Sequence, residues 1–458
     1  MSQNREQWGS KLGFILAASG SAVGIGNIWK YPSMAGQNGG GAFTLVYLAC
    51  ILVVGLSIVI AEFVIGRKTQ LSPVGAFEKL APGTNWKWVG YLGVASAFVI
   101  LSFYGVVGGW ILKYIIDSFS GGFDALAGNP EAAGTMFNGF ITSAWNPVIY
   151  QVLFMALCIG VIVKGVKGGI EKWSKVMMPL IVILLGMLAV RGMTLTGGME
   201  GLSFLFNPRF EDLTASAIVL ALGHSFFTVS LGMGTMITYG SYLDKKQNLM
   251  TSALWVIFLD TAIAMLAGVA IFTTVFALGA NPAEGPGLIF VVLPTVFAQM
   301  AGGAIWGTMF FILLFMAALT SAISILEVVT AYFIDQKGWS RKKATIQFGA
   351  VITVVGAFCS FSLGGGINIT EFMGMSFFDF MDGLSSKYML PIGGMFTAIF
   401  ILKKWGIPNF IDELKNGMDN FNIPPWLIRT LLTIGATVVA FIIFNEVYAE
   451  IFGKALIG

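Results

Sequence analysis

The chain has 458 residues, of which 56% are hydrophobic and 11% are charged, and its formal net charge is +3. Soluble globular proteins average about 45–50% apolar and about 25% charged residues. The composition excludes a disordered chain, a coiled coil and a nucleic-acid-binding arm, and it argues against a soluble multidomain enzyme. It indicates an all-α polytopic membrane protein in a lipid bilayer.

Apolar runs recur along the whole chain. A membrane-spanning helix needs about 20 mostly apolar residues, and Gly and Pro mark where such runs divide. The polar start, from Met1 to Lys11, lacks the layout of a cleaved signal peptide, so we expect the first span to be permanent. Eleven spans are predicted: residues 12–37, 41–66, 88–116, 147–164, 173–190, 214–240, 248–278, 305–334, 343–362, 373–402 and 426–448.

Basic residues alternate between the two sides of these spans. Nineteen of the 26 Lys and Arg residues lie on the side of the N-terminus, whereas loops 119–146 and 279–304 contain none. The positive-inside rule therefore predicts a cytoplasmic N-terminus and an extracytoplasmic C-terminus. The alternation of charge leaves no room for a further membrane crossing at the apolar stretch Gly285–Met300. This stretch is therefore predicted to be a re-entrant or surface-lying helix, with a buried loop as the alternative.

Cysteine and histidine are too sparse for a metal site. Cys50, Cys158 and Cys359 lie in apolar stretches without motif spacing, and His224 is the single histidine. We therefore expect buried thiols, with neither a disulfide framework nor a histidine-rich metal or haem site.

Two of the predicted spans carry glycines near their middle. Gly20, Gly24 and Gly26 interrupt the first span, and Gly232 and Gly234 interrupt the sixth. Glycine disfavours helix, and backbone can unwind at this depth only where it is buried or lines a cavity. The alternative is that these glycines serve close helix packing.

Paired breaks in the first and sixth spans predict a five-plus-five inverted repeat with a substrate site at the breaks. The repeats would cover residues 12–190 and 214–402, with 426–448 as an additional helix, in one transmembrane domain over 1–458. The N-terminal ends of broken helices attract carboxylates, and freed oxygens suit a monovalent cation. The pattern favours a carrier of a small carboxylate-bearing solute, coupled to a cation such as Na⁺.

Five sequence motifs occur in order along the chain. They are REQW at Arg5–Trp8, AVGIGNIWKYP at Ala22–Pro32, NGGGAF at Asn38–Phe43, FFTVSLGMG at Phe226–Gly234 and ALTSAISI at Ala318–Ile325. With them the chain resembles, over nearly its whole length, the neurotransmitter:sodium symporter family, which has the LeuT-type fold and works by alternating access. Eleven spans and an acidic residue at Asp260 resemble bacterial members, particularly the multi-hydrophobic and aromatic amino-acid carriers. This implies a location in the bacterial inner (plasma) membrane.

The resemblance implies two sodium sites. The first would use Ala22, Asn27, Thr228 and Asp260, completed by the substrate carboxylate. The second would use the carbonyls of Gly20, Val23 and Ala317 with the hydroxyls of Thr320 and Ser321. For the last two residues, ordinary hydrogen bonding of a hydroxyl to its own helix is the alternative.

The resemblance also implies a substrate pocket in which Tyr104 reaches the carboxylate beneath Phe227. Monoamine carriers of this family have an Asp where this chain has Gly24, so an intact amino acid is expected. Met233 is flexible enough to fit rings of different size, which favours large hydrophobic or aromatic amino acids. The implied pocket residues are Ser21, Ala22, Ile25, Gly26, Ile100, Tyr104, Phe227, Thr228, Ser230, Met233, Ser321 and Ile325.

Two gates follow from the same resemblance. Outside, Lys30 and Asp382 would form an ion pair above the pocket, and Lys30 replaces the family's usual Arg, which removes a bidentate bridge. Inside, Arg5 and Asp335 would close the cytoplasmic path, with Trp8 plugging it. For each of these charges, a solvated residue is the ordinary alternative.

An ionisable residue deep in a span is a functional candidate, and Asp260 is one. Animal members of the family require chloride, and Asp260 would supply that negative charge itself near Tyr47, His224 and Thr228. We therefore expect chloride-independent transport, with Asp260 protonated on the return step and thus proton antiport. For His224, hydrogen-bonded packing is the alternative to proton handling.

Gly169 and Pro179 mark the start of the fifth span. In the family this spacing marks a helix that unwinds to admit water to the second sodium site, whereas an ordinary proline kink is the alternative. The sequence as a whole predicts a sodium-coupled amino-acid symporter and not an enzyme. The competing functions are a transporter-like amino-acid sensor and a membrane-embedded enzyme, for which only His224 and Asp260 offer chemistry.

Overall fold

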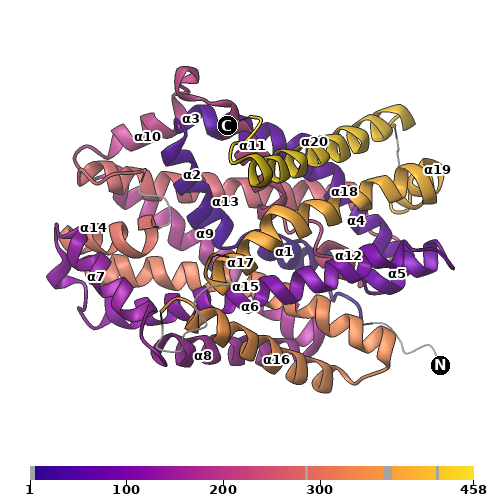
Figure 1. Cartoon of the computed structure of the whole chain (residues 1–458), viewed down its shortest axis with the longest axis horizontal. Coiled ribbons are helices and arrows are strands. Elements are labelled where there is room, and N and C mark those ends of the chain that lie inside the picture. Colours follow the sequence, from indigo (N-terminus) through magenta and orange to yellow (C-terminus); the bar gives the residue numbers. More distant parts are fainter. Residues whose placement is uncertain (1–5, 284–286, 365–373, 419–421, 458) are drawn as a thin grey trace.

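The structure is a computed structural model that describes residues 6–283, 287–364, 374–418 and 422–457. Every regular element in these ranges is a helix, and most of the helices lie lengthwise and side by side in Figure 1. The all-α prediction is therefore confirmed.

Eight apolar helices are each 21 to 35 residues long. At a rise of 1.5 Å per residue each can cross a hydrocarbon core about 30 Å thick. They are α3–η2–α4 (Gly41–Thr69), α6 (Lys87–Phe119), η4–α9 (Val166–Met193), α13 (Leu249–Ala277), α15 (Gly303–Lys337), α16 (Arg341–Phe361), α17–η7–α18–η8 (Phe377–Trp405) and α20 (Pro425–Phe452).

Three further spans are short or interrupted. In the first, α1 (Lys11–Ala22) meets η1–α2 (Gly26–Gln37) at an angle of 51°. The sixth is divided between α11 (Ala215–Thr228) and α12 (Thr235–Gly240), and the fourth is α8 (Asn146–Ile162). With the eight long helices, these three account for the eleven predicted spans, and the predicted breaks in spans one and six are confirmed.

Backbone geometry explains the break in the sixth span. Gly232 and Gly234 have φ angles of 78° and 76°, in the left-handed region that glycine adopts without strain. A Cβ atom on Gly232 would lie 2.0 Å from the carbonyl oxygen of Leu390, so no larger residue fits there. In the first span, Val23 turns to an extended conformation directly after α1, which ends the helix before Gly24.

The centre of the bundle is formed by α6 and α15, which are the most buried of the long helices, whereas α20 is the least buried. Short helices cover the ends of the bundle. They are α5 (Pro73–Leu80), α7 (Pro130–Ile141), α10 (Gly198–Phe206), η6–α14 (Leu288–Gln299), α19 (Ile407–Leu414) and the 3₁₀ turns η3 (Asp124–Leu126) and η5 (Phe210–Asp212).

The apolar stretch that follows α13 is a helix over Leu288–Gln299, as predicted, and the alternative of a buried loop is wrong. It packs against α6, where the Tyr114 hydroxyl donates a hydrogen bond to the Phe290 carbonyl at 2.9 Å.

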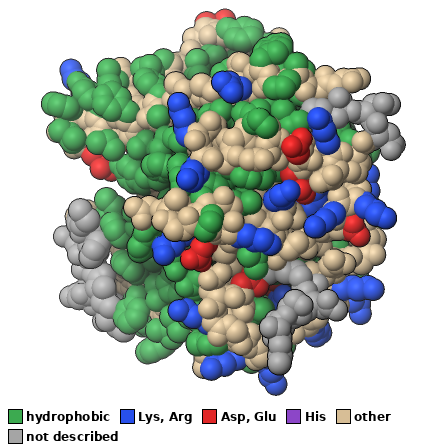
Figure 2. All heavy atoms as spheres, turned by 90° about the vertical axis from the view of Figure 1, so that its right-hand side faces the viewer, with side chains coloured by type: hydrophobic (Ala, Val, Ile, Leu, Met, Phe, Trp, Pro, Cys, Tyr) green, Lys and Arg blue, Asp and Glu red, His purple; other side chains and the backbone are tan. Residues whose placement is uncertain are grey.

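Lys and Arg side chains crowd the face at the right-hand end of Figure 1, where α5 and α19 lie; Figure 2 shows this face directly. We call it the basic end of the bundle. Exposed lysines include Lys245 and Lys246 in the loop after α12, and Lys403 and Lys404 at the end of the tenth span.

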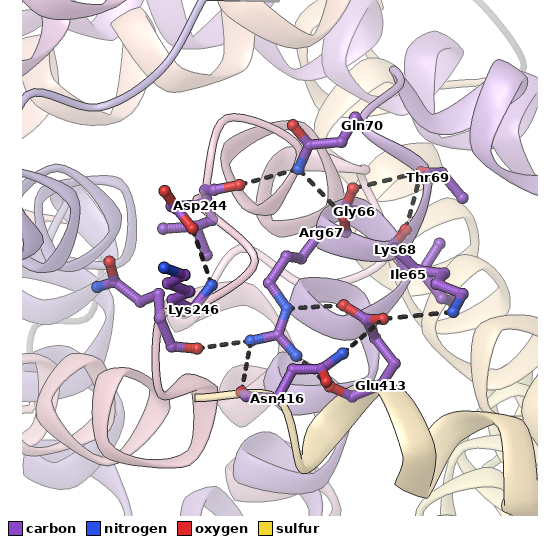
Figure 3. A network of polar contacts seen from close by, with 12 residues as sticks. Ile65, Gly66, Arg67, Lys68, Thr69, Gln70, Asp244, Lys246, Glu413 and Asn416 are labelled. Atoms are coloured by element: carbon purple, nitrogen blue, oxygen red, sulfur yellow. Dashed lines mark hydrogen bonds and ion pairs between the residues drawn. The ribbon is translucent and has the colours of Figure 1, made fainter. Parts of the chain in front are cut away.

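A buried ion pair ties α19 to the bundle at this end (Figure 3). Arg67, near the end of the second span, is fully buried, and its Nε lies 2.8 Å from Oε1 of Glu413 on α19. Its Nη1 donates to the carbonyl oxygens of Gln247 at 2.5 Å and Asn416 at 3.0 Å. One guanidinium thus joins three segments that are far apart in the sequence.

Candidate functional site

One cavity lies at the two breaks, between α1, α6, α11 and α15; its volume is about 20 Å³, and about 320 Å³ around it, open solvent included, is free of protein atoms. The structure brings together all twelve residues that the sequence assigned to a substrate pocket, and adds Gly24 to them. The lining consists of Ser21, Ala22, Gly24, Ile25, Gly26, Ile100, Tyr104, Phe227, Thr228, Ser230, Met233, Ser321 and Ile325.

Backbone groups released by the first break face polar side chains beside this cavity. The Ile25 N–H donates to the Tyr104 hydroxyl at 3.4 Å, and the Gly24 N–H donates to Asn27 Oδ1 at 3.1 Å. A Cβ atom on Gly24 would lie 2.5 Å from Ser321 Oγ. The start of η1–α2 therefore offers N–H donors and partial positive charge that no side chain at position 24 obstructs.

The other large side chains that line the cavity are apolar. Ile100, Phe227, Met233 and Ile325 line it without any ionisable group. The Phe227 ring also packs against Gly26, where a Cβ atom would lie 3.3 Å from the ring. A ligand with one carboxylate and one large apolar group matches this lining of the cavity.

Two of the four residues predicted for the first sodium site, Asn27 and Thr228, converge on a third, Asp260. Asn27 Nδ2 donates to Asp260 Oδ1 at 2.7 Å, and the Thr228 hydroxyl donates to the same oxygen at 3.2 Å. The fourth residue, Ala22, lines the cavity beside Thr228. Asp260 is fully buried, and in the part of the chain that the structure describes its Oδ2 has no hydrogen-bond partner. A buried carboxylate oxygen left without a donor fits a bound cation.

The residues predicted for the second sodium site also come together. The Ser321 hydroxyl lies 3.5 Å from the Gly20 carbonyl oxygen and 3.4 Å from that of Val23. The Thr320 hydroxyl donates to Ala317 O at 3.0 Å, which is the hydrogen bond within a helix that the alternative foresaw. All the oxygens of this second set are neutral, which suits a hard monovalent cation.

A transition-metal site is not formed in the described ranges, since no three His, Cys, Asp or Glu residues meet there. His224 is buried beside Tyr47, with 5.3 Å between the ring centroids. Neither of its ring nitrogens has a hydrogen-bond partner among the described residues, so the structure gives hydrogen-bonded packing no support.

Above the cavity, Lys30 and Asp382 form the predicted contact, with 3.3 Å between Nζ and Oδ1. The same Nζ lies 4.1 Å from the centroid of the Phe227 ring, which is close enough for a cation–π interaction. Lys30 thereby contacts both its acidic partner and a side chain that lines the cavity.

At the opposite end, Trp8 lies beneath α12, where its Nε1 donates to the Tyr239 carbonyl at 3.0 Å. Asp335 accepts a hydrogen bond from the Ser72 N–H at 2.6 Å. Arg5, the predicted partner of Asp335, lies outside the described residues.

The fifth span is helical at the motif where the sequence predicted unwinding. Gly169 lies in the π-helical turn η4 (Val166–Glu171), and Pro179 lies inside α9 (Lys172–Met193). A Cβ atom on Gly169 would lie 2.1 Å from the Val161 carbonyl oxygen, so glycine is required for this close approach.

Sequence reasoning missed two polar residues at the breaks. Glu62, on α4 (Leu56–Thr69), is fully buried and accepts a hydrogen bond from the Gly232 N–H at 2.8 Å. Ser324 lies 2.7 Å from Ser21, oxygen to oxygen. An acidic residue inside a predicted span was the available signal for Glu62. For Ser324 the available signal was its place inside the ALTSAISI motif at Ala318–Ile325.

Comparisons with known proteins agree with this geometry. The model of the sodium:neurotransmitter symporter family matches residues 5–125 and 139–452. A sodium-dependent transporter of Bacillus subtilis, YhdH, is 41% identical over 416 residues, which are 91% of each chain. A sodium-dependent transporter of Methanocaldococcus jannaschii is 34% identical over 90% of this chain and 86% of that protein. The crystal structure of MhsT in complex with L-phenylalanine superposes with a TM-score of 0.87, at 46% identity, over 96% of this chain and 99% of MhsT.

The chain belongs to the sodium:neurotransmitter symporter family. It is a sodium-dependent symporter with the LeuT-type fold, and it is a transporter and not an enzyme, as the sequence predicted.

Proposed function

We propose that this symporter imports large hydrophobic and aromatic L-amino acids together with Na⁺, by alternating access and without chloride. The observation that carries the proposal is the mixed lining of the cavity, which combines Tyr104 and the N–H groups of the first break with large, uncharged apolar side chains. MhsT, crystallised with L-phenylalanine, supports a ring-sized substrate.

The polar groups of this lining suit the carboxylate of an amino acid. The Tyr104 hydroxyl and the N–H groups at the start of η1–α2 supply donors, and the absence of a side chain on Gly24 lets the carboxylate approach the backbone. The substrate's apolar side chain would lie against Phe227, Met233 and Ile325.

Two Na⁺ ions are the proposed co-substrates. Ala22, Asn27, Thr228 and Asp260 would hold the first ion, and because Ala22 and Thr228 also line the cavity, that ion would lie beside the substrate carboxylate. Gly20, Val23, Ala317, Thr320 and Ser321 would hold the second ion, which would join α1 to α15. Each ion would favour the closed arrangement of the broken helix, which couples ion binding to substrate binding.

Asp260 is the basis for the proposed chloride independence. Its carboxylate already places one negative charge against Asn27 and Thr228, where a chloride-dependent carrier needs the anion. With no cation bound, this buried charge would take up a proton, and Asp260 would stay protonated through the return step, which gives proton antiport.

The remaining residues would act as gates. Lys30 and Asp382 would close the outer path. The inner path would be closed by Trp8 together with Arg5 and Asp335. Unwinding between Gly169 and Pro179 would open the second ion site to water. The N-terminus would face the cytoplasm of a bacterial cell, since the basic end is then inside.

Uptake into proteoliposomes tests the proposal. Labelled phenylalanine should accumulate only with an inward Na⁺ gradient, equally in chloride and gluconate, and a panel of all twenty amino acids should show the strongest competition from large apolar ones. Binding without accumulation would favour an amino-acid sensor. Accumulation that ignores the Na⁺ gradient would defeat the proposed coupling.

A further inference from the structure

A second hollow in the protein lies away from the central cavity. It is a groove of about 420 Å³ between the beginning of α6 and α18 (Leu390–Phe400). Trp86 and Leu92 line one wall, and Ile392 and Phe396 line the other. None of these residues belongs to the substrate pocket or to the proposed ion sites.

The residues of the groove indicate that it runs from the membrane interface into the apolar part of the spans. Trp88, beside its mouth, is 63% exposed, and Phe396 within it is 39% exposed. Tryptophan is enriched where hydrocarbon meets headgroups, and Leu92 lies one helical turn deeper than Trp88. The polar residues Thr84 and Asn85 also line the groove, next to Trp86. The shape thus has a polar mouth and an apolar interior.

Lysines follow closely in sequence on both walls of the groove. The Trp86 ring lies 5.2 Å from the ring of Phe400, and the following turn, η8 (Ile401–Trp405), carries the exposed Lys403 and Lys404. Lys87 follows Trp86 on the opposite wall. Within the described ranges, none of these three lysines has an ion-pair partner.

The neighbouring short helix does not cancel this charge. Phe77 of α5 packs on Phe400, with 5.0 Å between the ring centroids, so α5 lies close by. Its two exposed charged residues, Glu78 and Lys79, have opposite signs. The region around the groove therefore keeps the positive charge of Lys87, Lys403 and Lys404.

We propose that the groove binds one anionic phospholipid from the leaflet at the basic end of the bundle. An acyl chain would lie between Leu92 and the pair Ile392 and Phe396, and the phosphate would lie near Lys403 and Lys404. A zwitterionic lipid would fill the apolar part but bring no net charge for the lysines. A soluble anion would leave the apolar walls exposed.

Native mass spectrometry of the purified full-length protein tests the site, with phosphatidylglycerol and phosphatidylcholine of identical acyl chains. Phosphatidylglycerol should be retained preferentially. The double variant Lys403→Gln/Lys404→Gln should lose about fivefold in phosphatidylglycerol retention for each lysine removed, and nothing in phosphatidylcholine retention. The matched control Lys245→Gln/Lys246→Gln removes two exposed lysines from the same end but not from the groove, and it should retain the lipid.

A second variant tests the apolar part. Ile392→Trp fills the groove and should weaken both lipids by about tenfold, comparable to withdrawing two methylene groups from apolar contact. Added sn-glycerol 3-phosphate should not displace the lipid. The proposal would be overturned if the protein retained the two lipids equally, or if the two lysine pairs lost equal amounts of phosphatidylglycerol retention. Unchanged lipid binding in Ile392→Trp, or displacement of the lipid by the soluble phosphate, would also overturn it.

Discussion

The centre of the bundle and its basic end each contain a buried carboxylate, Asp260 and Glu413, but the two carboxylates differ in how many of their oxygens have hydrogen-bond partners. At the basic end, both carboxylate oxygens of Glu413 have donors: Arg67 at Oε1, and Lys68 and Asn416 at Oε2. At the centre, Asn27 and Thr228 share one oxygen of Asp260, and the other has no hydrogen-bond partner among the described residues.

The comparison separates a fixed contact from an exchangeable one. A buried ion pair whose hydrogen bonds are all made holds segments together, and breaking it costs several kcal/mol. A buried carboxylate with one open oxygen gains more from a cation that can enter and leave. We therefore expect changes at the basic end to alter stability, and changes at the centre to alter ion coupling.

The largest expected effect is on stability. Arg67→Met leaves Glu413 buried with only the half-exposed Lys68 as a charged partner, and should lower the free energy of unfolding by about 3–5 kcal/mol. Denaturation of the purified protein in detergent measures this. The control Lys68→Met removes the exposed partner of the same carboxylate and should cost less than about 1 kcal/mol. Similar small losses in both variants would break the comparison.

Asp260→Asn should chiefly affect coupling. Removing the charge from the first ion site should reduce Na⁺-driven uptake in chloride-free buffer by about 100-fold, since a charged partner at a buried site contributes roughly 3 kcal/mol. Chloride should restore part of the uptake. Unchanged sodium dependence with no gain of chloride dependence would sink the role proposed for Asp260, and thermal unfolding close to that of the wild type would separate coupling from stability.

A smaller effect is expected on substrate choice. Met233→Phe replaces a flexible side chain in the lining of the cavity with a rigid ring. Uptake of tryptophan should fall about tenfold relative to leucine, as one misfit in an apolar pocket costs about 1–3 kcal/mol. Competition assays with the two amino acids measure the ratio. An unchanged ratio would exclude Met233 as a determinant of substrate choice, and Leu92→Met, outside the cavity, is the control.

The smallest effect is expected at the outer ion pair. Lys30 and Asp382 are partly exposed, so Lys30→Ala should lose at most about 1 kcal/mol for the pair, which corresponds to about fivefold faster release of bound substrate. Stopped-flow release of labelled phenylalanine measures this rate. Lys387→Ala, which removes another partly exposed ion pair, with Glu446, should leave the rate unchanged. An effect on the release rate as large as the effect of Asp260→Asn on uptake would contradict the comparison.

Local sequence rules predicted the fold better than they predicted the charged contacts. Gly232 and Gly234 marked the sixth-span break because their conformation is intrinsic to glycine. The cavity residues came from the family resemblance, since no local periodicity connects Ile100 to Phe227. Arg67 and Glu413 are 346 positions apart, so their pairing depends on how α19 folds back on the bundle, which local patterns do not encode.

The position of Phe227 links substrate size to closure. The ring contacts both the cation of Lys30 and the backbone at Gly26, and it also lines the cavity. A substrate too bulky for the cavity would have to push this ring outward, and the ring would then press on the lysine above it. Closure above the cavity would thereby depend on the volume of the substrate, and an oversized amino acid would prevent closure and would not be transported.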